Sequence, residues 1–452
     1  MASTVVPAEQ PFVPVITGGD VGAYSLAREF HEAYGLISAV VPTTVNRNLR
    51  YSRILQAFPA GPMTEERPVI DALVRVAGQL RGQDRPLLLL ASYDHLVRFA
   101  VRHRATLEAA GYTVPYPDED ALDAAALKEN FYALCERLGV PYPKTATYDA
   151  GHHTGQAARR FSARLGDRPA DGPGEGDTGA AGVRFPVILK AGDGGAWADI
   201  RFEGRRKVHV VGEDGGAAEI ERLITLASEA GYSGSLIVQE LVPGPDSQLG
   251  IATFFRDGAG ATRLVSYGEV IVEDHAPGTE GNARAVLAGR HPVITTMGTA
   301  LLDALDWRGF AMFDTKIDPR TGQPQFLEMN PRLGRNHYYL TASGANPAPY
   351  LVEEYLGAEN LTGLDTGLDT GLVTPGLVTT AGPALTTTIP MSLVRRHATE
   401  SQRQRIRQAA QQGRVVRPFS YDADRDLRRE AYHRATELNS LRVFRNHPAP
   451  EA

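Results

Sequence analysis

The stretch PQFLEMNPRLGRNH, residues 324–337, places a carboxylate, an amide, two arginines and a histidine directly after an apolar run. Gln325 to Leu327 has the pattern of a strand that leaves a hydrophobic core. Glu328 and Asn330 are two residues apart on that strand, so their side chains face the same way. Such a strand end is either an ordinary solvated terminus or one wall of a charged site.

The other arm of the same predicted hairpin supplies a further carboxylate. The run FAMFDTKID precedes a turn at 318–322, and antiparallel pairing can bring Asp314 onto the face of Glu328 and Asn330. Two carboxylates and an amide oxygen are hard ligands that suit a magnesium ion bound with nucleotide phosphates. The alternative is that all three are surface positions of an amphipathic hairpin, and the hairpin alone leaves both readings open.

Length and composition narrow the class of protein. A chain of 452 residues is too long for one core, so we expect two to four domains or subdomains. Its net charge of −6 gives no overall basic field for nucleic acid. A single cysteine, Cys135, excludes an intramolecular disulfide and a zinc site built from several cysteines. No long apolar run predicts a membrane span, and the N-terminus lacks the pattern of a signal peptide, so we expect a cytoplasmic protein.

The first part of the chain, residues 1–117, reads as a small α/β domain of Rossmann type. Buried strands are predicted at 13–17, 37–41 and 85–92, and a Gly-Gly turn with Asp20 as a cap precedes the first helix. The three apolar runs and their spacing predict a parallel sheet.

Residues 118–350 form the next predicted domain, and residues 351–452 a small C-terminal extension. One helix is expected from Asp120 to Leu138, and Gly139 ends it. Composition predicts two structureless segments, a flexible insertion at 166–182 and a disordered loop at 357–382. Arg-rich helices at 400–413 and 425–438 are expected to be solvated or interfacial.

Lysine is scarce in this chain. Of 47 basic residues only five are lysines, at 128, 144, 190, 207 and 316. A chain that favours arginine should keep lysine where a compact charge is needed, such as beside a phosphate oxygen. Lys190 ends a strand just before a glycine-rich loop, Gly192 to Gly195, whose backbone N–H groups could cradle phosphates. The alternative is a plain hairpin turn, and no Walker A loop occurs.

The run IVQELVPG, residues 237–244, is a strand that ends in a Pro-Gly turn. Its backbone could hydrogen-bond an adenine base, with Glu240 or Asp246 accepting from the ribose hydroxyls. By itself a strand before a turn explains this piece equally well.

The order of these features resembles the ATP-grasp superfamily over roughly residues 120–345. The resemblance implies an α/β fold: an N-terminal Rossmann-like pre-ATP-grasp domain, then a two-lobed ATP-grasp domain with a mobile lid at about 145–240. It implies ATP and Mg²⁺ as cofactors, with Mn²⁺ as the alternative ion. Asp314, Glu328 and Asn330 match the metal ligands. Arg332 and Lys190 match residues that act on the transferring phosphate. The residues that match nucleotide contacts are Lys128, Lys190, Gly192, Gly194, Gly195, Gln239, Glu240, Leu241, Val242, Asp246 and Lys316.

Within the superfamily, TGGDVGAYSLAREFHEAYG, NPRLGRNHYYLTASGANP and IPMSLVRRHA resemble carboxylate–amine ligases related to D-aspartate ligase. This implies an ATP-dependent enzyme that activates a carboxylate, of an amino acid, as an acyl phosphate and joins it to an amine. The amine would belong to an amino acid, a peptide or a cell-wall precursor. Some of Arg335, Asn336 and His337, which directly follow the strand of Glu328 and Asn330, are expected to hold the carboxylate or amine substrate. The alternative for His337 is a polar residue at the start of a helix. Two departures are Asp314, where glutamate is common, and the segment 268–282, which lacks an expected arginine near its start.

Three alternatives stay open. A phosphotransferase or a non-catalytic ATP-binding protein could use the same fold, because fold does not fix function. An NAD-dependent oxidoreductase is the third, although the glycines after the first strand do not have the G-x-G-x-x-G spacing and the second strand ends without an acid for the ribose. A homodimer is the default expectation for assembly.

Overall fold

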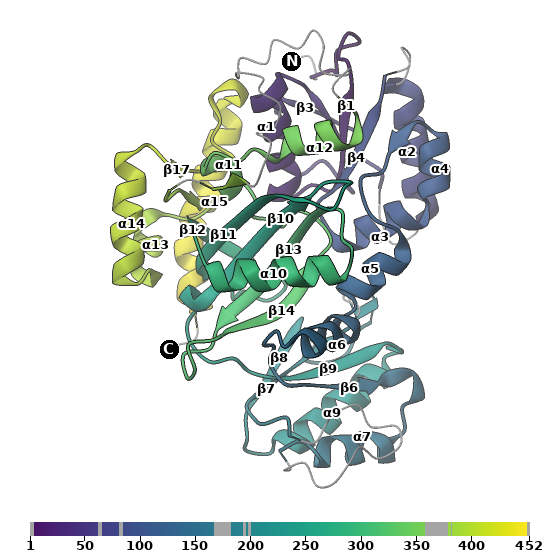
Figure 1. The fold of residues 1–452 in the computed structure, drawn as a ribbon, viewed down its shortest axis with the longest axis vertical. Coiled ribbons are helices and arrows are strands. Elements are labelled where there is room, and N and C mark those ends of the chain that lie inside the picture. The colour runs from purple at the N-terminus through teal and green to yellow at the C-terminus, as the bar shows by residue number, and fades with distance from the viewer. Residues whose placement is uncertain are drawn as a thin grey trace.

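The computed structural model describes residues 4–61, 66–80, 85–166, 182–192, 196–197, 200–357, 378–380 and 382–449. Within these ranges the chain forms sheets of five, eight and four strands. Figure 1 shows the five-stranded sheet at the top, the eight-stranded sheet in the middle and the four-stranded sheet at the bottom. The flexible insertion expected at 166–182 lies almost entirely outside the described residues and stays a prediction. The disordered loop expected at 357–382 is wrong at Val378–Thr379, which form a strand paired with β11, Thr262–Glu273; residues 358–377 lie outside the described residues, so the expectation there stays a prediction.

The N-terminal domain is a parallel sheet in the order β3-β2-β1-β4-β5, with helices between its strands. The predicted strands at 13–17, 37–41 and 85–92 are confirmed, because their uninterrupted apolar runs are buried on both faces of the sheet. The elements are β1 Val13–Thr17, α1 Val21–Tyr34, β2 Ser38–Val41, β3 Leu55–Ala57, α2 Glu66–Leu80, β4 Leu87–Ala91, α3 Asp94–Arg102, α4 Arg104–Ala109 and β5 Tyr112–Thr113.

Helix α1 is set at both ends by its sequence. The Asp20 carboxylate accepts a hydrogen bond from the Ala23 N–H at 3.0 Å, as the predicted cap requires. Gly35 ends the helix in the left-handed conformation. Almost every residue of α1 is buried, since the helix lies between the first sheet and the rest of the chain. It is therefore the main contact of the N-terminal domain with the later domains.

The single helix expected over 120–138 is wrong. The chain forms α5, Glu119–Ala126, and α6, Lys128–Leu138, separated at Leu127, whose backbone is extended. The break starts a new helix at Lys128 and turns α6 along the hairpin that carries Glu328. Cys135 lies buried in α6, as expected for an inert cysteine.

A separate four-stranded sheet in the order β6-β9-β7-β8 makes up the lower lobe. Its strands are β6 Thr145–Asp149, β7 Val187–Ala191, β8 Val208–Val211 and β9 Ser235–Glu240. Helices α7, Gly155–Ala163, and α9, Gly216–Glu229, cover one face through an apolar cluster. The lobe falls within the span predicted to be a mobile lid, and its movement stays a prediction.

The eight-stranded central sheet joins distant parts of the chain. Its order is β14-β13-β10-β11-β12-β16-β17, and β15 pairs with β11. One face packs on α5, α6 and α10, and the other on α1, α11 and α12. The elements are β10 Leu249–Arg256, β11 Thr262–Glu273, β12 Ala283–Gly289, α10 Pro292–Ala304, β13 Gly309–Ile317, β14 Pro324–Asn330, α11 Tyr339–Ala342, α12 Pro347–Tyr355, β15 Val378–Thr379, β16 Leu385–Thr387 and β17 Val415–Val416.

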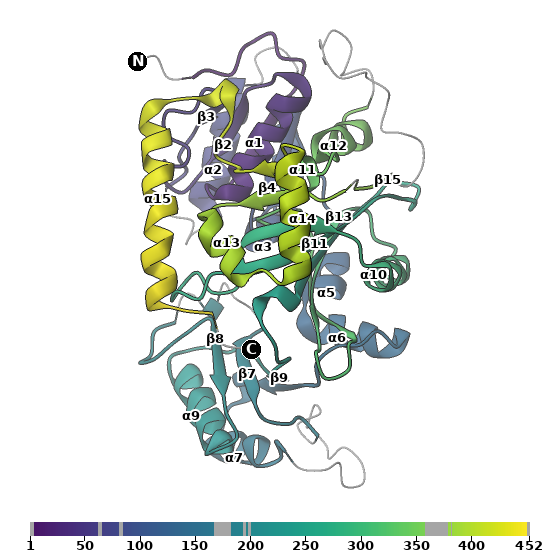
Figure 2. The same ribbon diagram turned by 90° about the vertical axis from the view of Figure 1, so that its left-hand side faces the viewer.

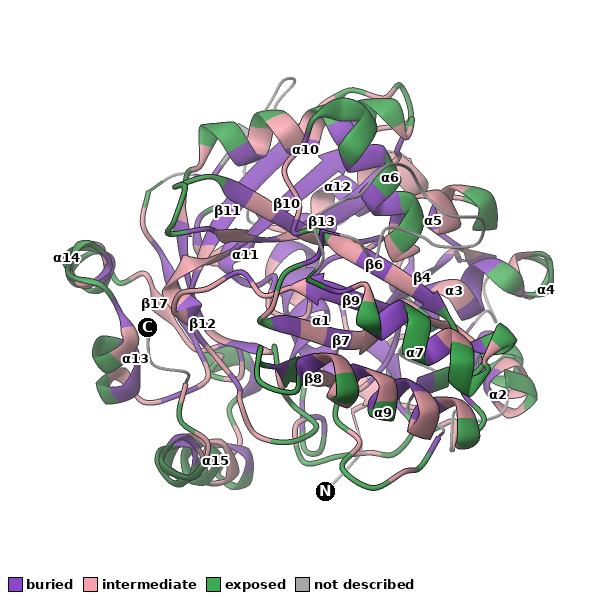
Figure 3. Ribbon diagram, turned by 90° about the horizontal axis from the view of Figure 1, so that it is seen from below, coloured by how far each residue is buried: buried purple, intermediate pink, exposed green. Residues whose placement is uncertain are grey.

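The C-terminal residues contact both the central sheet and the N-terminal domain. After β16 come α13, Met391–His397, α14, Glu400–Gln411, and α15, Leu427–Asn446. Figure 2 shows α15 running along the side of the molecule, and Figure 3 shows that the outward faces of these helices are exposed. The Arg-rich helices were expected to be solvated or interfacial, and they are both, because their outward faces are exposed and their inward faces pack on the rest of the chain.

Arg429 on α15 lies at such an interface. Its side chain is buried and pairs with the buried carboxylate of Asp424. Asp424 also accepts hydrogen bonds from Tyr24 and Ser52 of the N-terminal domain. Among the described helices none combines the length and the apolar character of a membrane span.

Candidate functional site

The hairpin of β13 and β14 brings three predicted metal ligands together. Asp314 and Glu328 are direct partners in the strand register, and a β-bulge follows immediately after Asp314. The Asn330 side-chain N–H donates to Asp314 Oδ2 at 3.0 Å. Two carboxylates and an amide therefore share one face of the hairpin, as the sequence predicts.

Lysines face these carboxylates from two other elements. Lys128 Nζ at the start of α6 lies 3.7 Å from Glu328 Oε2. Desolvation alone would raise the pKa of Glu328, but the charges of Lys128 and Lys190 lower it below its ordinary value. The pKa of Asp314 is raised by desolvation and by the neighbouring Glu328 carboxylate. The lysine charges thus favour the ionised form of Glu328, whereas burial and the Glu328 charge disfavour the ionised form of Asp314.

Lys190 reaches this group from the lower lobe. Its ammonium group donates to Gln239 Oε1 at 3.2 Å, and Gln239 in turn donates to the hydroxyls of Tyr132 and Thr145, each at 2.8 Å. Desolvation lowers the pKa of Lys190, while the carboxylates of Glu328 and Asp314 oppose that change. The Gln239 side chain therefore holds the Lys190 ammonium group in place.

The segment after β9, predicted as the adenine hinge, is held by backbone hydrogen bonds. The Glu240 carboxylate accepts from the Arg184 N–H at 2.9 Å, and the Leu241 N–H donates to the Pro186 carbonyl at 2.9 Å. Val242 is buried. The turn after this segment is therefore fixed to the start of β7.

The predicted phosphate loop is described only in part. The Gly192 N–H donates to the Ser235 carbonyl at 2.8 Å, which anchors the end of β7 to β9. Gly194 and Gly195 lie outside the described residues. Their role stays a prediction.

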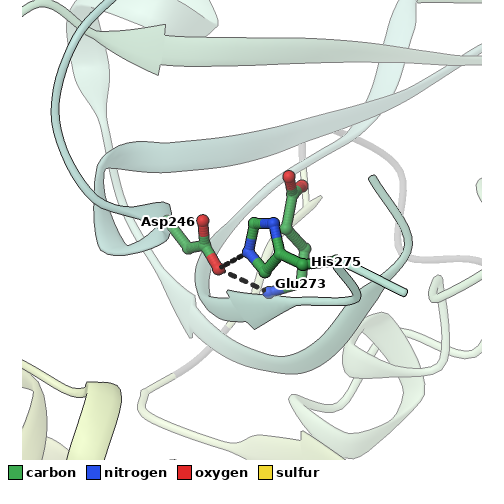
Figure 4. A group of neighbouring side chains, drawn as sticks. All are labelled: Asp246, Glu273 and His275. Carbon is green, nitrogen blue, oxygen red and sulfur yellow. Dashed lines mark hydrogen bonds and ion pairs between the residues drawn. The ribbon is translucent and has the colours of Figure 1, made fainter. Parts of the chain in front are cut away.

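Asp246, the expected ribose acid, lies in an ion-paired cluster that sequence reasoning missed. Its Oδ2 atom is 2.8 Å from His275 Nε2 and accepts the Glu273 N–H at 3.0 Å (Figure 4). Lys316 lies close by and donates to the Gly244 carbonyl at 2.8 Å. Desolvation and the Asp246 charge raise the pKa of Glu273 to about 7. The sequence signal for this cluster is the run Glu-Asp-His at 273–275. Segment 268–282 was considered only for an expected arginine.

The three side chains in Figure 4 are of kinds that bind metals, and their ligand atoms lie within 4.8 Å of one another. However, Asp246 already pairs with His275. The charges of Lys316 and Lys207 also act on Glu273. This balance of charges is that of an internal ion-pair network beside the hinge.

Arg332 and Arg335 follow β14, and their side chains contact the N-terminal domain. Arg332 Nε lies 2.8 Å from Asp94 Oδ1, and its Nη2 donates to Asp94 Oδ2 at 2.8 Å. Arg335 Nε lies 3.3 Å from Asp20 Oδ2. Neither aspartate was among the predicted site residues, although each lies three residues after the end of an apolar strand.

His337 does not line this site, which corrects its prediction as a substrate contact. Its ring is buried, with Nε2 2.8 Å from Glu29 Oε2 and Nδ1 2.7 Å from the Gly334 carbonyl. A histidine with both ring nitrogens partnered inside a domain contact has no atom left for a ligand. Asn336 is half-buried beside it.

Solved structures share this arrangement of domains. An L-amino acid ligase from Bacillus licheniformis superposes with a TM-score of 0.52 at 14% identity, over 77% of this chain and 76% of that one. An N5-carboxyaminoimidazole ribonucleotide synthetase, solved as an ADP complex, gives a TM-score of 0.51 at 14% identity, over 78% of each chain. The chain has the ATP-grasp fold. The predicted fold class is confirmed.

A curated relative narrows the resemblance within ATP-grasp proteins. D-aspartate ligase from Enterococcus faecium (strain Aus0004) is 28% identical over 346 residues, which cover 76% of this chain and 77% of the relative. No protein-family model matches the sequence. The predicted resemblance to ATP-grasp carboxylate–amine ligases is thereby confirmed, and the comparisons support ATP-dependent ligation of a carboxylate and an amine.

Proposed function

We propose that this chain activates the carboxylate of an amino acid with ATP, as an acyl phosphate, and joins it to an amine. The observation that carries the proposal is the cluster of Asp314, Glu328 and Asn330 with two lysines. Lys128 comes from α6 and Lys190 from the lower lobe. Charges of both signs at one strand end suit a nucleotide with its metal ion, and they would be costly on an ordinary hairpin.

The residues present fit a magnesium ion. Burial and the neighbouring Glu328 carboxylate raise the pKa of Asp314, and a bound divalent cation would offset the repulsion between the two carboxylates. Asp314, Glu328 and Asn330 would hold the ion, which supplies charge neutralisation for the β- and γ-phosphates when bound. Mn²⁺ offers the same preference for oxygen ligands.

The residues of the chain would position the substrates and neutralise the charge of the phosphates. Lys128 and Lys190 would lie against phosphate oxygens from opposite lobes, and Arg332 would stabilise the charge that develops on the transferring phosphoryl group. The backbone of residues 239–242 would hold the adenine base. Approach of the lower lobe would exclude water, which otherwise hydrolyses an acyl phosphate.

The substrate class follows from the relatives. One acts on D-aspartate and one on L-amino acids by name, so an amino acid is the proposed donor. The acceptor would be an amine on a further amino acid, a peptide or a cell-wall precursor. A cytoplasmic location and a homodimer belong to the same proposal.

A phosphotransferase is the second candidate, since it would use the same nucleotide site. The test is ADP release by the purified chain with Mg²⁺, ATP and a panel of amino acids of both chiralities, with hydroxylamine present. A hydroxamate formed with one class of acid supports carboxylate activation. ADP that appears with a phosphorylated product and no hydroxamate would instead favour the phosphotransferase.

A further inference from the structure

The outward face of α15 has a composition that the proposed nucleotide site does not explain. Figure 2 shows the helix along one side of the molecule, and Figure 3 shows exposed residues on its outward side. Exposed residues at spacings of four and three form one stripe along the helix, here called the outward stripe: Leu427, Ala431, Arg434, Leu438, Leu441 and Arg445. Leu427 is 84% exposed, Leu438 62% and Leu441 43%.

The opposite face of α15 holds the helix against the rest of the chain. Its buried residues are Arg429, Ser440 and Phe444. The centroid of the Phe444 ring lies 5.8 Å from that of the His397 ring at the end of α13, and Phe444 shares an apolar cluster with residues of α13 and α14. The three leucines lie outside this contact, so the packing of the helix does not account for them. Exposed apolar side chains that gather on one face mark an interaction surface.

The charges on and beside the outward stripe are of one sign. Arg434, Arg442 and Arg445 are exposed, and none of them forms an ion pair with another described residue. The two acidic residues within the helix are engaged elsewhere, because Glu430 pairs with Arg425 and Glu437 with Arg417. The stripe therefore offers leucine side chains and guanidinium groups together.

The C-terminal part of the chain is basic as a whole. Residues 391–452 hold 13 arginines and 7 acidic residues, a net charge of +6, whereas the whole chain carries −6 and residues 1–390 therefore carry −12. Arg395 and Arg396 at the end of α13 are also exposed. Because His397 contacts Phe444, they extend the basic surface beside the C-terminal end of α15. Such an asymmetry of charge indicates an anionic partner for this side of the molecule.

The pairing of leucine with arginine selects among anionic partners. A second copy of this helix would bring like charges together, and nucleic acid would offer phosphates without an apolar layer for the leucines. An anionic phospholipid surface offers both, and a helix of 20 residues, about 30 Å long, can lie in its plane.

We propose that α15 docks on an anionic phospholipid surface, with its leucines at the boundary of the acyl chains and its arginines among the phosphate headgroups. This inference does not depend on the proposed function, and it concerns a surface contact rather than a membrane span.

The test is flotation of the full chain with vesicles of phosphatidylcholine alone and of phosphatidylcholine mixed with an equal amount of phosphatidylglycerol. The variants are Leu441→Glu and Arg445→Glu. Their matched controls are Val74→Glu and Arg75→Glu on α2, because Val74 is 42% exposed and Arg75 is exposed beside it. Thermal unfolding of each variant checks that the fold is intact.

We expect the wild type to float with the anionic vesicles and not with phosphatidylcholine alone, and its binding should weaken as the salt concentration rises. Each α15 variant should weaken binding at least about tenfold, and the two α2 variants should leave it unchanged.

No binding to the anionic vesicles would overturn the proposal, as would equal binding to both kinds of vesicle or equal losses in the α2 controls. A dimer that dissociates in Leu441→Glu, without vesicle binding by the wild type, would also overturn it and assign the outward stripe to a second copy of the chain.

Discussion

Lys128 Nζ lies 3.7 Å from Glu328 Oε2, which ties the first residue of α6 to the strand that carries the candidate metal ligands. The contact exists because the chain breaks at Leu127 and starts a new helix at Lys128. With Lys190 approaching from the lower lobe, the carboxylates of the hairpin face positive charge from two sides. These contacts put both lysines beside the carboxylates that the proposal assigns to the metal ion.

Replacing Glu328 with glutamine tests the metal assignment. The amide keeps the shape of the side chain and removes its charge, so we expect kcat to fall by at least about 100-fold with little change in thermal stability. ADP release under saturating ATP measures the effect, with Asp71→Asn, which breaks an exposed ion pair with Arg67 on α2, as the control. Near-wild-type turnover in Glu328→Gln would show that this carboxylate does not hold the ion.

The lysine contact has a matched control in the same chain. Lys128→Gln removes a charge that faces the site, whereas Lys144→Gln removes one that is exposed at the start of β6. A charge-assisted contact contributes about 1.5–3 kcal/mol, so kcat/KM for ATP should fall roughly 10- to 100-fold in Lys128→Gln alone. Equal effects of both substitutions would contradict the specific role of Lys128.

The buried pair of His337 and Glu29 predicts how stability depends on pH. Burial alone would lower the pKa of His337, but the Glu29 carboxylate raises it above 6.5. The pair therefore stabilises the fold fully below pH 6.5, and its contribution is lost as the pH rises through the folded-state pKa.

Comparison of wild type with His337→Gln measures that contribution. The difference in the free energy of unfolding should be about 3 kcal/mol or more at pH 6 and should shrink as the pH rises. The affinity for the amino acid should not change, because the ring does not line the site. A loss of affinity at full stability would restore His337 as a substrate contact.

The C-terminal segment should be required for stability. Asp424 is buried and accepts hydrogen bonds from Tyr24 at 2.7 Å and from Ser52 at 2.9 Å, beside the charge of Arg429. Asp424→Asn leaves Arg429 without its partner, so we expect a loss of about 3 kcal/mol in chemical denaturation. Glu430→Gln, which breaks the more exposed pair with Arg425, should lower the stability far less. Similar losses in both variants would contradict the buried network.

Local pattern was enough to predict the hairpin, the parallel strands and the Asp20 cap, because each depends on residues a few positions apart. Asp314 and Glu328 are partners in one hairpin, so their meeting could be read from the sequence. The predicted order of charged motifs was specific enough for the fold.

The site contacts that were not predicted join segments that are distant in the sequence. The partner of Arg332 is Asp94, 238 positions away, and the partner of His337 is Glu29, 308 positions away. Periodicity carries no information about such pairs, so His337 was assigned to the substrate and Asp94 was overlooked. The break at Leu127 was missed for a different reason, since neither a proline nor a glycine marks it in the sequence.

Acyl phosphate formation is the central claim, and an isotope label tests it directly. The amino acid that supports ADP release is prepared with ¹⁸O in its carboxylate groups, and the released phosphate is analysed by mass spectrometry. Attack of a carboxylate oxygen on the γ-phosphorus, followed by attack of the amine on the carbonyl carbon, leaves that oxygen on phosphate. The account therefore predicts one ¹⁸O atom in each phosphate molecule formed with product. Amide formed with unlabelled phosphate would contradict it.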